Sequence, residues 1–475
     1  MKEGYIPKEQ RKRILLLTDD IRFTSGVGNV GKEIVLHTAH RYNWYNVGAA
    51  MKHPEIGKII DISDDVNKNA GIEDAEVTIQ PYNGYGDPML VRNLMKQYQI
   101  DAIFLITDPR YFTWLFQIEN EIRQHIPIIY LNIWDDYPAP MYNKGYYESV
   151  DTLLGISKQT VNINKLVLGD KAKNKLISYV PHGMNTSNFY PITVEDLEFN
   201  TFKKQTKTED KDFILFFNSR NIRRKQIPDT MLAFKYFLDK LPKEKADKCS
   251  LILHTEMISE AGTDLKAVAD MIFGPENSNI IFSTQKLSPQ QLNYLYNLAD
   301  AQILLTSNEG WGLSLTEALL TGTPIIANVT GGMQDQMRFE DENGNWIDFD
   351  ADFPSNHTGK YKNCGEWAFP VYPVARTLKG SPPTPYIWDD ICRAEDAADR
   401  IMELYEMGSE ERKRRGMEGY KWATGDEAGF TSKLMADRVV NAVEETFNTF
   451  QPREKFEFIN TNEYQVDTTP HKFLY

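Results

Sequence analysis

Two glutamates with glycines between them are the residues of this sequence best placed to bind a substrate. Seven residues separate Glu309 from Glu317, and Gly310 and Gly312 lie between them. A carboxylate accepts two hydrogen bonds at once, which suits the neighbouring hydroxyls of a ribose or a hexose. A helix is predicted to start near Ser314, and the backbone N–H groups at its beginning favour a phosphate. The spacing therefore predicts a site for a phosphorylated sugar or a nucleotide.

A basic loop precedes these glutamates in the same half of the chain. Arg220 and Lys225 follow the strand predicted over residues 213–217, so they lie at its carboxyl end. A guanidinium fork and an ammonium group there would neutralise a diphosphate and stabilise it as a leaving group without a metal ion. A solvated surface loop is the alternative interpretation.

A glycine-rich loop near the start of the chain matches the pattern GxGxxG through Gly26, Gly28 and Gly31. In a dinucleotide-binding fold the first glycine follows its strand closely, and an acidic residue about twenty positions later binds the ribose. Here a stretch of seven residues separates the strand from Gly26, and residues 46–52 contain no acid. An NAD-dependent oxidoreductase therefore stays open only as a disfavoured alternative. The loop still lets a ligand approach the backbone closely, beside a helix N-terminus.

Short apolar runs alternate with helical patterns along the chain, and the elements that they predict must position the glutamates, the basic loop and the glycine-rich loop. Such alternation is typical of a parallel α/β sheet, whose strands bind ligands at their carboxyl ends. The runs are residues 14–18, 102–106, 128–131 and 152–155, and then 213–217, 251–253, 280–282, 301–305 and 324–327. We therefore expect a first lobe over residues 1–200, a polar linker over 201–212 and a second lobe over 213–425. A C-terminal helix and tail over 426–475 are expected to pack back on the first lobe.

An insertion in the second lobe, residues 351–390, is rich in proline and aromatic residues and shows no helical or strand period. Loops of this length are usually functional or disordered, and the large apolar area of the rings favours an ordered one. Its rings include Trp367, Tyr372, Tyr386 and Trp388. We expect at least one of these four rings to face the cleft between the lobes.

The composition of the 475 residues is that of a globular protein, with 41% hydrophobic and 25% charged residues. The formal net charge of −14 disfavours a protein that coats nucleic acid. The three cysteines form no CxxC pair, and the longest apolar stretch, residues 126–134, is far shorter than the ~18 residues of a membrane span. No signal peptide is visible at the start. We expect a cytoplasmic protein without a metal site.

Several motifs together resemble a known family. They are Arg220-x4-Lys225, Ala299-Asp300-Ala301, Glu309-x7-Glu317, Gly322-x-Pro324, Gly331-Gly332, and the segment Pro181-His182-Gly183 between the lobes. Over residues 13–345 the sequence resembles the retaining glycosyltransferases of family four, also called glycosyltransferase group one. The resemblance implies an α/β fold of the GT-B type, with two Rossmann-like lobes facing one cleft. It also implies a hexosyl- or pentosyltransferase that uses a nucleoside-diphosphate sugar, with retention and without metal or cofactor.

The resemblance also implies a role for individual residues. Arg220 and Lys225 would hold the donor diphosphate, and Glu317 would bind the ribose. Glu309 would act in catalysis and bind the donor sugar and phosphate together with the amides of Gly310, Trp311, Gly312 and Leu313. Gly26 and Gly28 would let the first lobe close on the phosphates. The nucleobase would lie near Gln285, Lys286 and Leu287.

The sequence departs from the family pattern at one point. Many members carry a histidine at the end of the first-lobe strand that here covers residues 129–136, and this segment contains none. Asp135 and Asp136 are the nearest polar residues, and either could orient a hydroxyl group in catalysis. The alternative is that they cap a turn before Pro138.

The acceptor is the least determined part of this prediction. No basic amphipathic helix stands out in the first lobe, so a soluble glycan or small molecule is expected before a membrane lipid. Phage-type transfer to a modified DNA base is an alternative, because an aromatic pocket suits a flipped base, although the net charge opposes it. A protein that binds a nucleotide sugar without transferring it is an alternative of another class.

Overall fold

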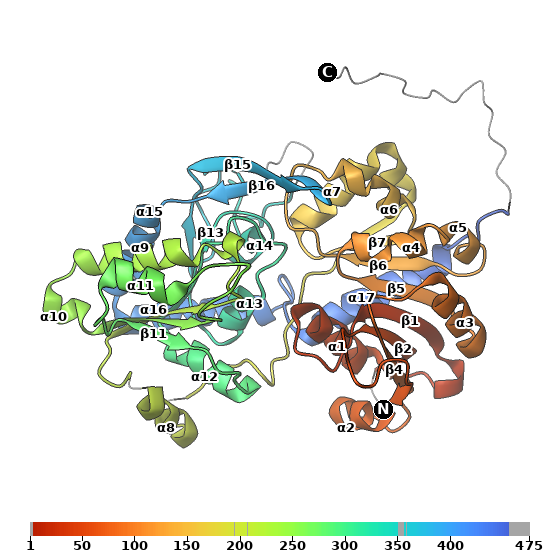
Figure 1. Ribbon diagram of the computed structural model, residues 1–475, viewed down its shortest axis with the longest axis horizontal. Helices are drawn as coiled ribbons and strands as arrows, with labels where there is room; N and C mark the ends of the chain where they lie inside the picture. The colour runs from red at the N-terminus through yellow and green to blue at the C-terminus, as the bar shows by residue number, and fades with distance from the viewer. Residues whose placement is uncertain (1–2, 194, 207, 350–355, 358, 456–475) are drawn as a thin grey trace, which may run out of the picture.

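The computed structural model describes residues 3–193, 195–206, 208–349, 356–357 and 359–455. Within them the chain forms two α/β lobes side by side, each built around its own sheet (Figure 1). This arrangement confirms the predicted α/β fold with two Rossmann-like lobes.

The first lobe contains an eight-stranded sheet in the order β3-β4-β2-β1-β5-β6-β7-β8. All neighbours are parallel except β3 and β4. The strands are β1 (Lys12–Asp19), β2 (Tyr42–Ala49), β3 (Ile60–Asp61), β4 (Val77–Tyr82), β5 (Ala102–Ile106), β6 (Ile128–Asn132), β7 (Thr152–Gly155) and β8 (Leu176–Tyr179). The helices are α1 (Gly26–Thr38), α2 (Ser63–Ala70), α3 (Pro88–Tyr98), α4 (Thr113–Phe116), α5 (Glu119–Ile122), α6 (Lys144–Glu148) and α7 (Lys158–Leu168). Strands β5, β6 and β7 are buried along their whole length, as continuous apolar runs require.

The second lobe contains a six-stranded parallel sheet in the order β11-β10-β9-β12-β13-β14. Its strands are β9 (Phe213–Asn218), β10 (Cys249–His254), β11 (Ile280–Ser283), β12 (Ala301–Leu304), β13 (Ile325–Asn328) and β14 (Ala368–Val371). The helices are α9 (Ile227–Asp239), α10 (Lys243–Ala246), α11 (Leu265–Phe273), α12 (Pro289–Leu298), α13 (Leu313–Leu320), α14 (Met333–Met337), α15 (Ala394–Glu406) and α16 (Gly408–Thr424). In both lobes the carboxyl ends of the central strands carry the loops that line the cavity described below.

The expected linker over residues 201–212 is partly helical. Helix α8 (Leu197–Thr206) packs through Phe199 and Phe202 on Tyr294 of α12, with ring centroids 5.6 and 5.3 Å apart. Part of the polar composition that suggested a linker, such as Lys204 and Gln205, belongs to the exposed side of this helix. The expectation of a linker across the whole range was therefore wrong, because two apolar residues suffice to dock a short helix.

The aromatic insertion is also more regular than expected. It contains β14 at the edge of the second sheet and an antiparallel hairpin of β15 (Ala375–Ser381) and β16 (Thr384–Ile391). Residues 351–355, where the insertion begins, lie outside the described part of the chain. Trp367 is buried in the second lobe and stacks on Trp422, with ring centroids 4.9 Å apart. The prediction of a segment without period was wrong. Strand β14 is too short to show a period, and β15 and β16 form a largely exposed hairpin without alternate buried and exposed positions.

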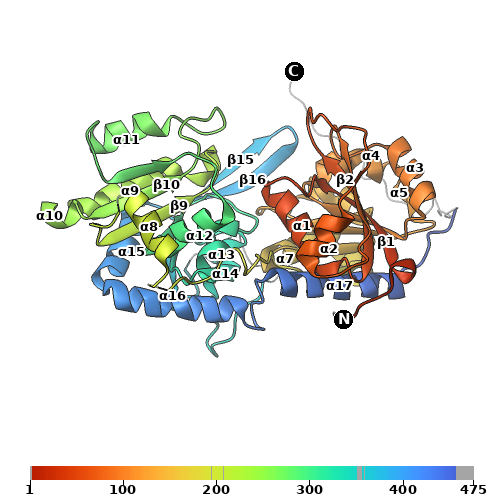
Figure 2. The same cartoon turned by 90° about the horizontal axis from the view of Figure 1, so that it is seen from below.

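The hairpin reaches from the second lobe to the first (Figure 2). The Trp388 N–H donates to the carbonyl of Tyr137 at 2.8 Å, and the Tyr142 hydroxyl donates to the carbonyl of Tyr386 at 3.0 Å. The Trp388 ring packs against the apolar core of the first lobe. The hairpin therefore connects the two lobes by both hydrogen bonds and apolar contacts.

Helix α17 (Ser432–Thr449) returns the chain to the first lobe and runs along it (Figure 2). The hydroxyls of Thr152 and Thr446 lie 2.7 Å apart, and the Tyr42 hydroxyl donates to Glu444 at 2.6 Å. None of the helices in the described ranges is both long and apolar enough to cross a membrane.

Candidate active site

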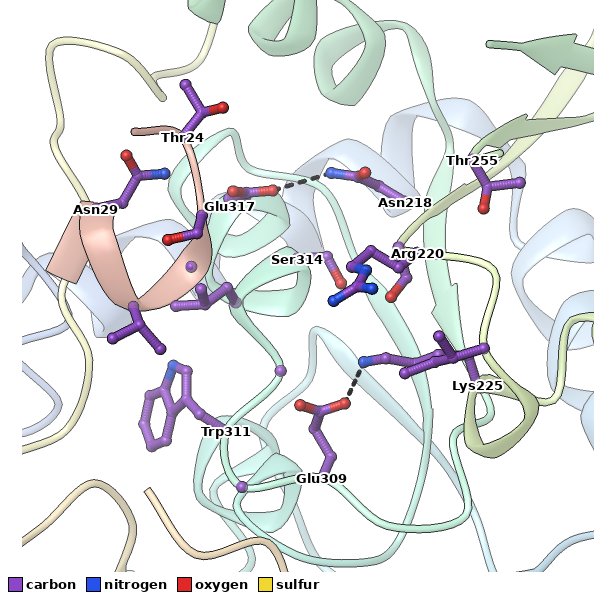
Figure 3. Close-up of a pocket in the computed structure, with 18 of the residues that line it drawn as sticks. Thr24, Asn29, Asn218, Arg220, Lys225, Thr255, Glu309, Trp311, Ser314 and Glu317 are labelled. Carbon is purple, nitrogen blue, oxygen red and sulfur yellow. Dashed lines mark hydrogen bonds and ion pairs between the residues drawn. The ribbon is translucent and has the colours of Figure 1, made fainter. Parts of the chain in front are cut away.

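A cavity of about 780 Å³ lies between the lobes. Strands of both sheets end at its wall, which is where open α/β sheets bind ligands. Residues at or just beyond these strand ends are Asp19 (β1), Ile106 (β5), Ile133 (β6), Asn218 (β9), His254 (β10) and Ser283 (β11). Figure 3 shows the polar side chains that the two lobes direct into this space.

Glu309 lies in the loop between β12 and α13 and is held by two cations. Arg224 Nη1 donates to Glu309 Oε2 at 2.8 Å, and Lys225 Nζ donates to the same oxygen (Figure 3). Burial alone would raise the pKa of Glu309, but the charges of Arg224 and Lys225 outweigh it and lower this pKa to about 2. Glu309 is therefore ionised across the physiological range.

Glycines shape the loop that carries Glu309. Gly312 precedes α13 with a φ of 87°, in the left-handed region that favours glycine. A Cβ added at Gly331 would lie 2.0 Å from the carbonyl oxygen of Glu309, and one added at Gly332 would lie 2.0 Å from that of Gly310. The Gly332 N–H also donates to the Glu309 carbonyl at 2.9 Å. The backbone of Gly331 and Gly332 thus packs directly on the backbone of Glu309 and Gly310. This packing fixes the N–H groups at the start of α13.

Glu317 lies on α13 and faces the cavity together with Asn218 (Figure 3). Its Oε2 accepts hydrogen bonds from Asn218 Nδ2 at 3.2 Å and from the hydroxyl of Tyr296. Burial raises the pKa of Glu317 to about 7, and the two hydrogen bonds oppose this rise only in part. No cation is among the causes of the shift, so the two glutamates have opposite electrostatic environments.

Arg220 adds a cation that pairs with no other side chain of the described residues. It is exposed on the wall of the cavity (Figure 3), and its guanidinium has no hydrogen bond or ion pair within the described part of the chain. Lys225 by contrast is buried, and burial lowers its pKa although Glu309 opposes this. The second lobe thus offers an anion one free guanidinium beside a paired ammonium.

The structure brings most of the predicted site residues to the cavity wall. These are Gly26, Asp135, Arg220, Lys225, Lys286, Glu309, Gly310, Trp311, Gly312, Leu313 and Glu317. Gly28 and Leu287 are not among the lining residues. Gly28 is buried behind the loop, where an added Cβ would lie 2.9 Å from Ser25 Oγ, and Leu287 packs against the core of the lobe.

The two adjacent aspartates have different positions. Asp135 lines the cavity, and its Oδ1 accepts the Gly310 N–H at 3.1 Å, which ties the first lobe to the Glu309 loop. Asp136 is fully buried and does not line the cavity. It accepts hydrogen bonds from Gln159 at 3.0 Å and Thr330 at 3.0 Å. The catalytic role expected for Asp136 is corrected to a structural one, because no substrate atom reaches a group buried in this way.

None of the four rings singled out in the insertion lines the cavity. Trp367 belongs to the core, and Tyr372 packs on Phe339 with ring centroids 6.4 Å apart. Tyr386 and Trp388 contact the first lobe outside the cavity. The hairpin leads Tyr386 and Trp388 across to the other lobe, so these rings contact both lobes, but none of the four borders the cavity that a substrate would occupy.

Sequence reasoning missed some lining residues. Arg224 was not assigned, although it belongs to a visible basic run with Arg223 and Lys225. Thr24 and Ser25, in the glycine-rich loop, and His182, in the segment between the lobes, also line the cavity. The motifs that contain them were recognised in the sequence, but a sequence motif does not show which of its side chains point into the cavity.

Solved structures define the class of fold. The Anabaena protein Alr3699/HepE in complex with UDP and glucose superposes with a TM-score of 0.63 and 12% identity, covering 92% of this chain and all of that one. Sucrose-phosphate synthase of Thermosynechococcus elongatus gives a TM-score of 0.63 and 14% identity, again covering 92% of this chain and all of that one. These likenesses confirm the predicted GT-B fold.

The family model of glycosyl transferases group 1 matches residues 198–353. The matched residues lie largely in the second lobe, and the match confirms the family resemblance seen in the sequence.

The alpha-monoglucosyldiacylglycerol synthase of Streptococcus pneumoniae (strain ATCC BAA-255 / R6) is 23% identical over 262 residues. The match covers 52% of this chain and 55% of that protein, about half the length of each.

Proposed function

We propose that this protein is a glycosyltransferase that moves a sugar from a nucleoside diphosphate to an acceptor, with retention and without a metal ion. One observation carries the proposal: the cavity combines a free guanidinium, Arg220, with two glutamates in opposite electrostatic environments, Glu309 and Glu317. A donor of this kind needs one region for its diphosphate, one for its ribose and one for its sugar.

The diphosphate fits the basic wall of the second lobe. Arg220 offers a planar fork to phosphate oxygens, and Lys225 lies next to it with its ammonium bound to Glu309. The N–H groups at the start of α13 add partial positive charge. Cations and fixed dipoles of this kind stabilise the charge that develops on a departing diphosphate. In the described residues, no group of three or more His, Cys, Asp and Glu is placed to hold a metal ion.

The ribose and base fit the other end of the cavity. Glu317 presents a carboxylate to neighbouring hydroxyls, and Lys286 lines the wall that follows β11. His254, the last residue of β10, and Thr255, the next residue, also line the cavity. These groups would hold a nucleoside by hydrogen bonds.

Retention requires that the new bond form on the same face of the sugar as the old one. In the proposed step the acceptor oxygen bonds to the anomeric carbon while the bond from that carbon to the phosphate oxygen breaks. The acceptor proton passes to the leaving phosphate oxygen. Glu309 is ionised beside the sugar region, and its charge would favour the positive character of the anomeric carbon. Asp135, a first-lobe carboxylate on the cavity wall, would orient the acceptor hydroxyl.

The comparisons say more about the identity of the donor than about the identity of the acceptor. One structural neighbour was solved with UDP and glucose, so UDP-glucose is the first donor to try. The pneumococcal relative is named for a glycolipid. We nevertheless place a soluble glycan or small molecule first among acceptors of this chain, because its first lobe lacks a visible basic amphipathic stretch.

The test is incubation with a panel of nucleotide sugars and acceptors in the presence of a chelator. The acceptors include free glycans, a diacylglycerol glycolipid and hydroxymethylated DNA, with products identified by mass spectrometry and their anomeric configuration by NMR. We expect chelator-resistant transfer that keeps the donor configuration. A requirement for a divalent ion, or an inverted product, would contradict the corresponding part of the proposal. Saturable binding without transfer to any acceptor would favour a binding protein.

A further inference from the structure

His182 lies on the cavity wall and has no place in the function proposed above. It follows β8 in the segment that leads out of the first lobe, and only 6% of its surface is exposed. Its Nδ1 is buried and has no hydrogen-bond partner in the part of the chain that the structure describes. A buried polar atom of this kind calls for an explanation, since nearly all such atoms in folded proteins are paired.

The backbone around His182 is held firmly. The Met184 N–H donates to the Phe430 carbonyl at 3.0 Å, and the Ser432 N–H donates to the Met184 carbonyl at 2.9 Å. A Cβ added at Gly183 would lie 2.2 Å from the carbonyl oxygen of Thr431, so the two segments pack without space between them. The unpaired nitrogen is therefore not a result of a loose loop.

The imidazole ring itself lies against Trp311 in an edge-on contact, with ring centroids 6.3 Å apart. Trp311 in turn packs edge-on against Phe430, with ring centroids 4.9 Å apart. These apolar contacts would be made equally well by a phenylalanine. Packing explains the size of the side chain but not its nitrogen atoms.

The chemistry of the ring restricts what it can bind. Burial lowers the pKa of His182 to about 4, although the nearby charge of Glu309 opposes this. The ring is therefore neutral at pH 7, with one nitrogen that donates and one that accepts. A neutral donor and acceptor suits a hydroxyl group better than a phosphate, which cations bind.

We propose that His182 hydrogen-bonds a hydroxyl group of the donor sugar and contributes to the choice of that sugar. The inference rests on the proposed function. The sugar is the fitting part of the donor because His182 adjoins Trp311 and lies within the electrostatic range of Glu309, in the loop assigned to the sugar. The ribose, base and diphosphate have other partners in Glu317, Lys286 and Arg220.

The test compares two probes, UDP and UDP-glucose, by titration calorimetry on the full chain. In His182→Phe the ring contact with Trp311 is kept and both nitrogens are removed. We expect the affinity of the variant for UDP to stay within about twofold of the wild-type affinity. Its affinity for UDP-glucose should be about tenfold weaker, because one hydrogen bond is lost. The exposed His125→Asn exchange is the control and should change neither affinity.

Thermal unfolding of the ligand-free protein gives a second readout. Because His182→Phe removes a buried unpaired nitrogen, we expect the Tm of the variant to equal or exceed that of the wild type. A lower Tm with equal losses for both probes would show that His182 is only structural and overturn the inference. Unchanged UDP-glucose affinity would also overturn it. If the wild type binds UDP, and no nucleotide sugar binds more tightly than UDP does, the contact with the sugar is refuted while nucleotide binding stands. If the wild type binds neither UDP nor a nucleotide sugar, the proposed function itself is refuted.

Discussion

Glu317 offers a test of the site that needs no substrate. Its pKa rises in the folded protein from the ordinary value of 4.5 to about 7, because the carboxylate is shielded from water beside Tyr296 and Asn218, and no cation of the described residues is among the causes of the shift. The folded state therefore keeps the Glu317 proton between these two values, whereas the unfolded chain has released it. Linkage then requires that the free energy of unfolding fall as the pH rises from about 4.5 through 7, and level off above that range.

The size of the effect follows from the shift. A shift from 4.5 to about 7 corresponds to an upper limit of about 3 kcal/mol. Since Glu317 borders a cavity that admits water, we expect about 1–3 kcal/mol. A glutamine at this position still accepts hydrogen bonds from its two partners but has no proton to lose. We therefore expect Glu317→Gln to be more stable than the wild type at pH 8 by this amount, and nearly equal to it at pH 4.5.

The assay is chemical denaturation of both proteins at several pH values between 4.5 and 8.5. The matched control is Glu342→Gln, an exposed residue at which the difference from the wild type should stay within about 0.5 kcal/mol throughout. A difference between Glu317→Gln and the wild type that does not change with pH would refute the reasoning. In the same variant the affinity for UDP should fall about tenfold at pH 8, because a charged acceptor for the ribose hydroxyls is lost.

Three further predictions concern the loop and the lobe contacts. Glu309→Gln should lower transfer at least about 100-fold in a steady-state assay but leave UDP binding equal or tighter, because Lys225 loses its competing partner; weaker UDP binding would contradict this. Gly332→Ala should lower the free energy of unfolding by about 2–4 kcal/mol in denaturant, since its Cβ would lie 2.0 Å from a carbonyl oxygen. The control is Gly145→Ala in helix α6, where an added Cβ meets nothing within 4 Å. This variant should be neutral or stabilising by up to about 1 kcal/mol. Equal effects in the two glycine variants would refute the close-packing argument. Trp388→Ala should cost about 2 kcal/mol by the same measurement, and Trp388→Phe less than half of that; no loss would show that the hairpin does not couple the lobes.

Much of the architecture was readable from local patterns. Apolar runs such as residues 102–106 and 213–217 predicted buried parallel strands, because a strand covered on both faces must be apolar at every position. Strand β2 was not predicted, because its sequence mixes aromatic residues with asparagines and is not a continuous apolar run. Only the assembled sheet buries these residues. The hairpin of β15 and β16 was missed for a related reason: its rings are covered by the other lobe, not by their own neighbours in the chain.

The same division holds within the site. Residue types and spacing by themselves indicated Glu309, Glu317, Arg220 and Lys225, because carboxylates, cations and glycines at strand ends have few other uses together. Only the tertiary structure decided that Glu309 pairs with Arg224 and Lys225 and stays ionised, while Glu317 is shielded from water with no ion pair to another described residue. A pKa depends on charges and burial contributed by distant parts of the chain, and these do not exist until the chain has folded.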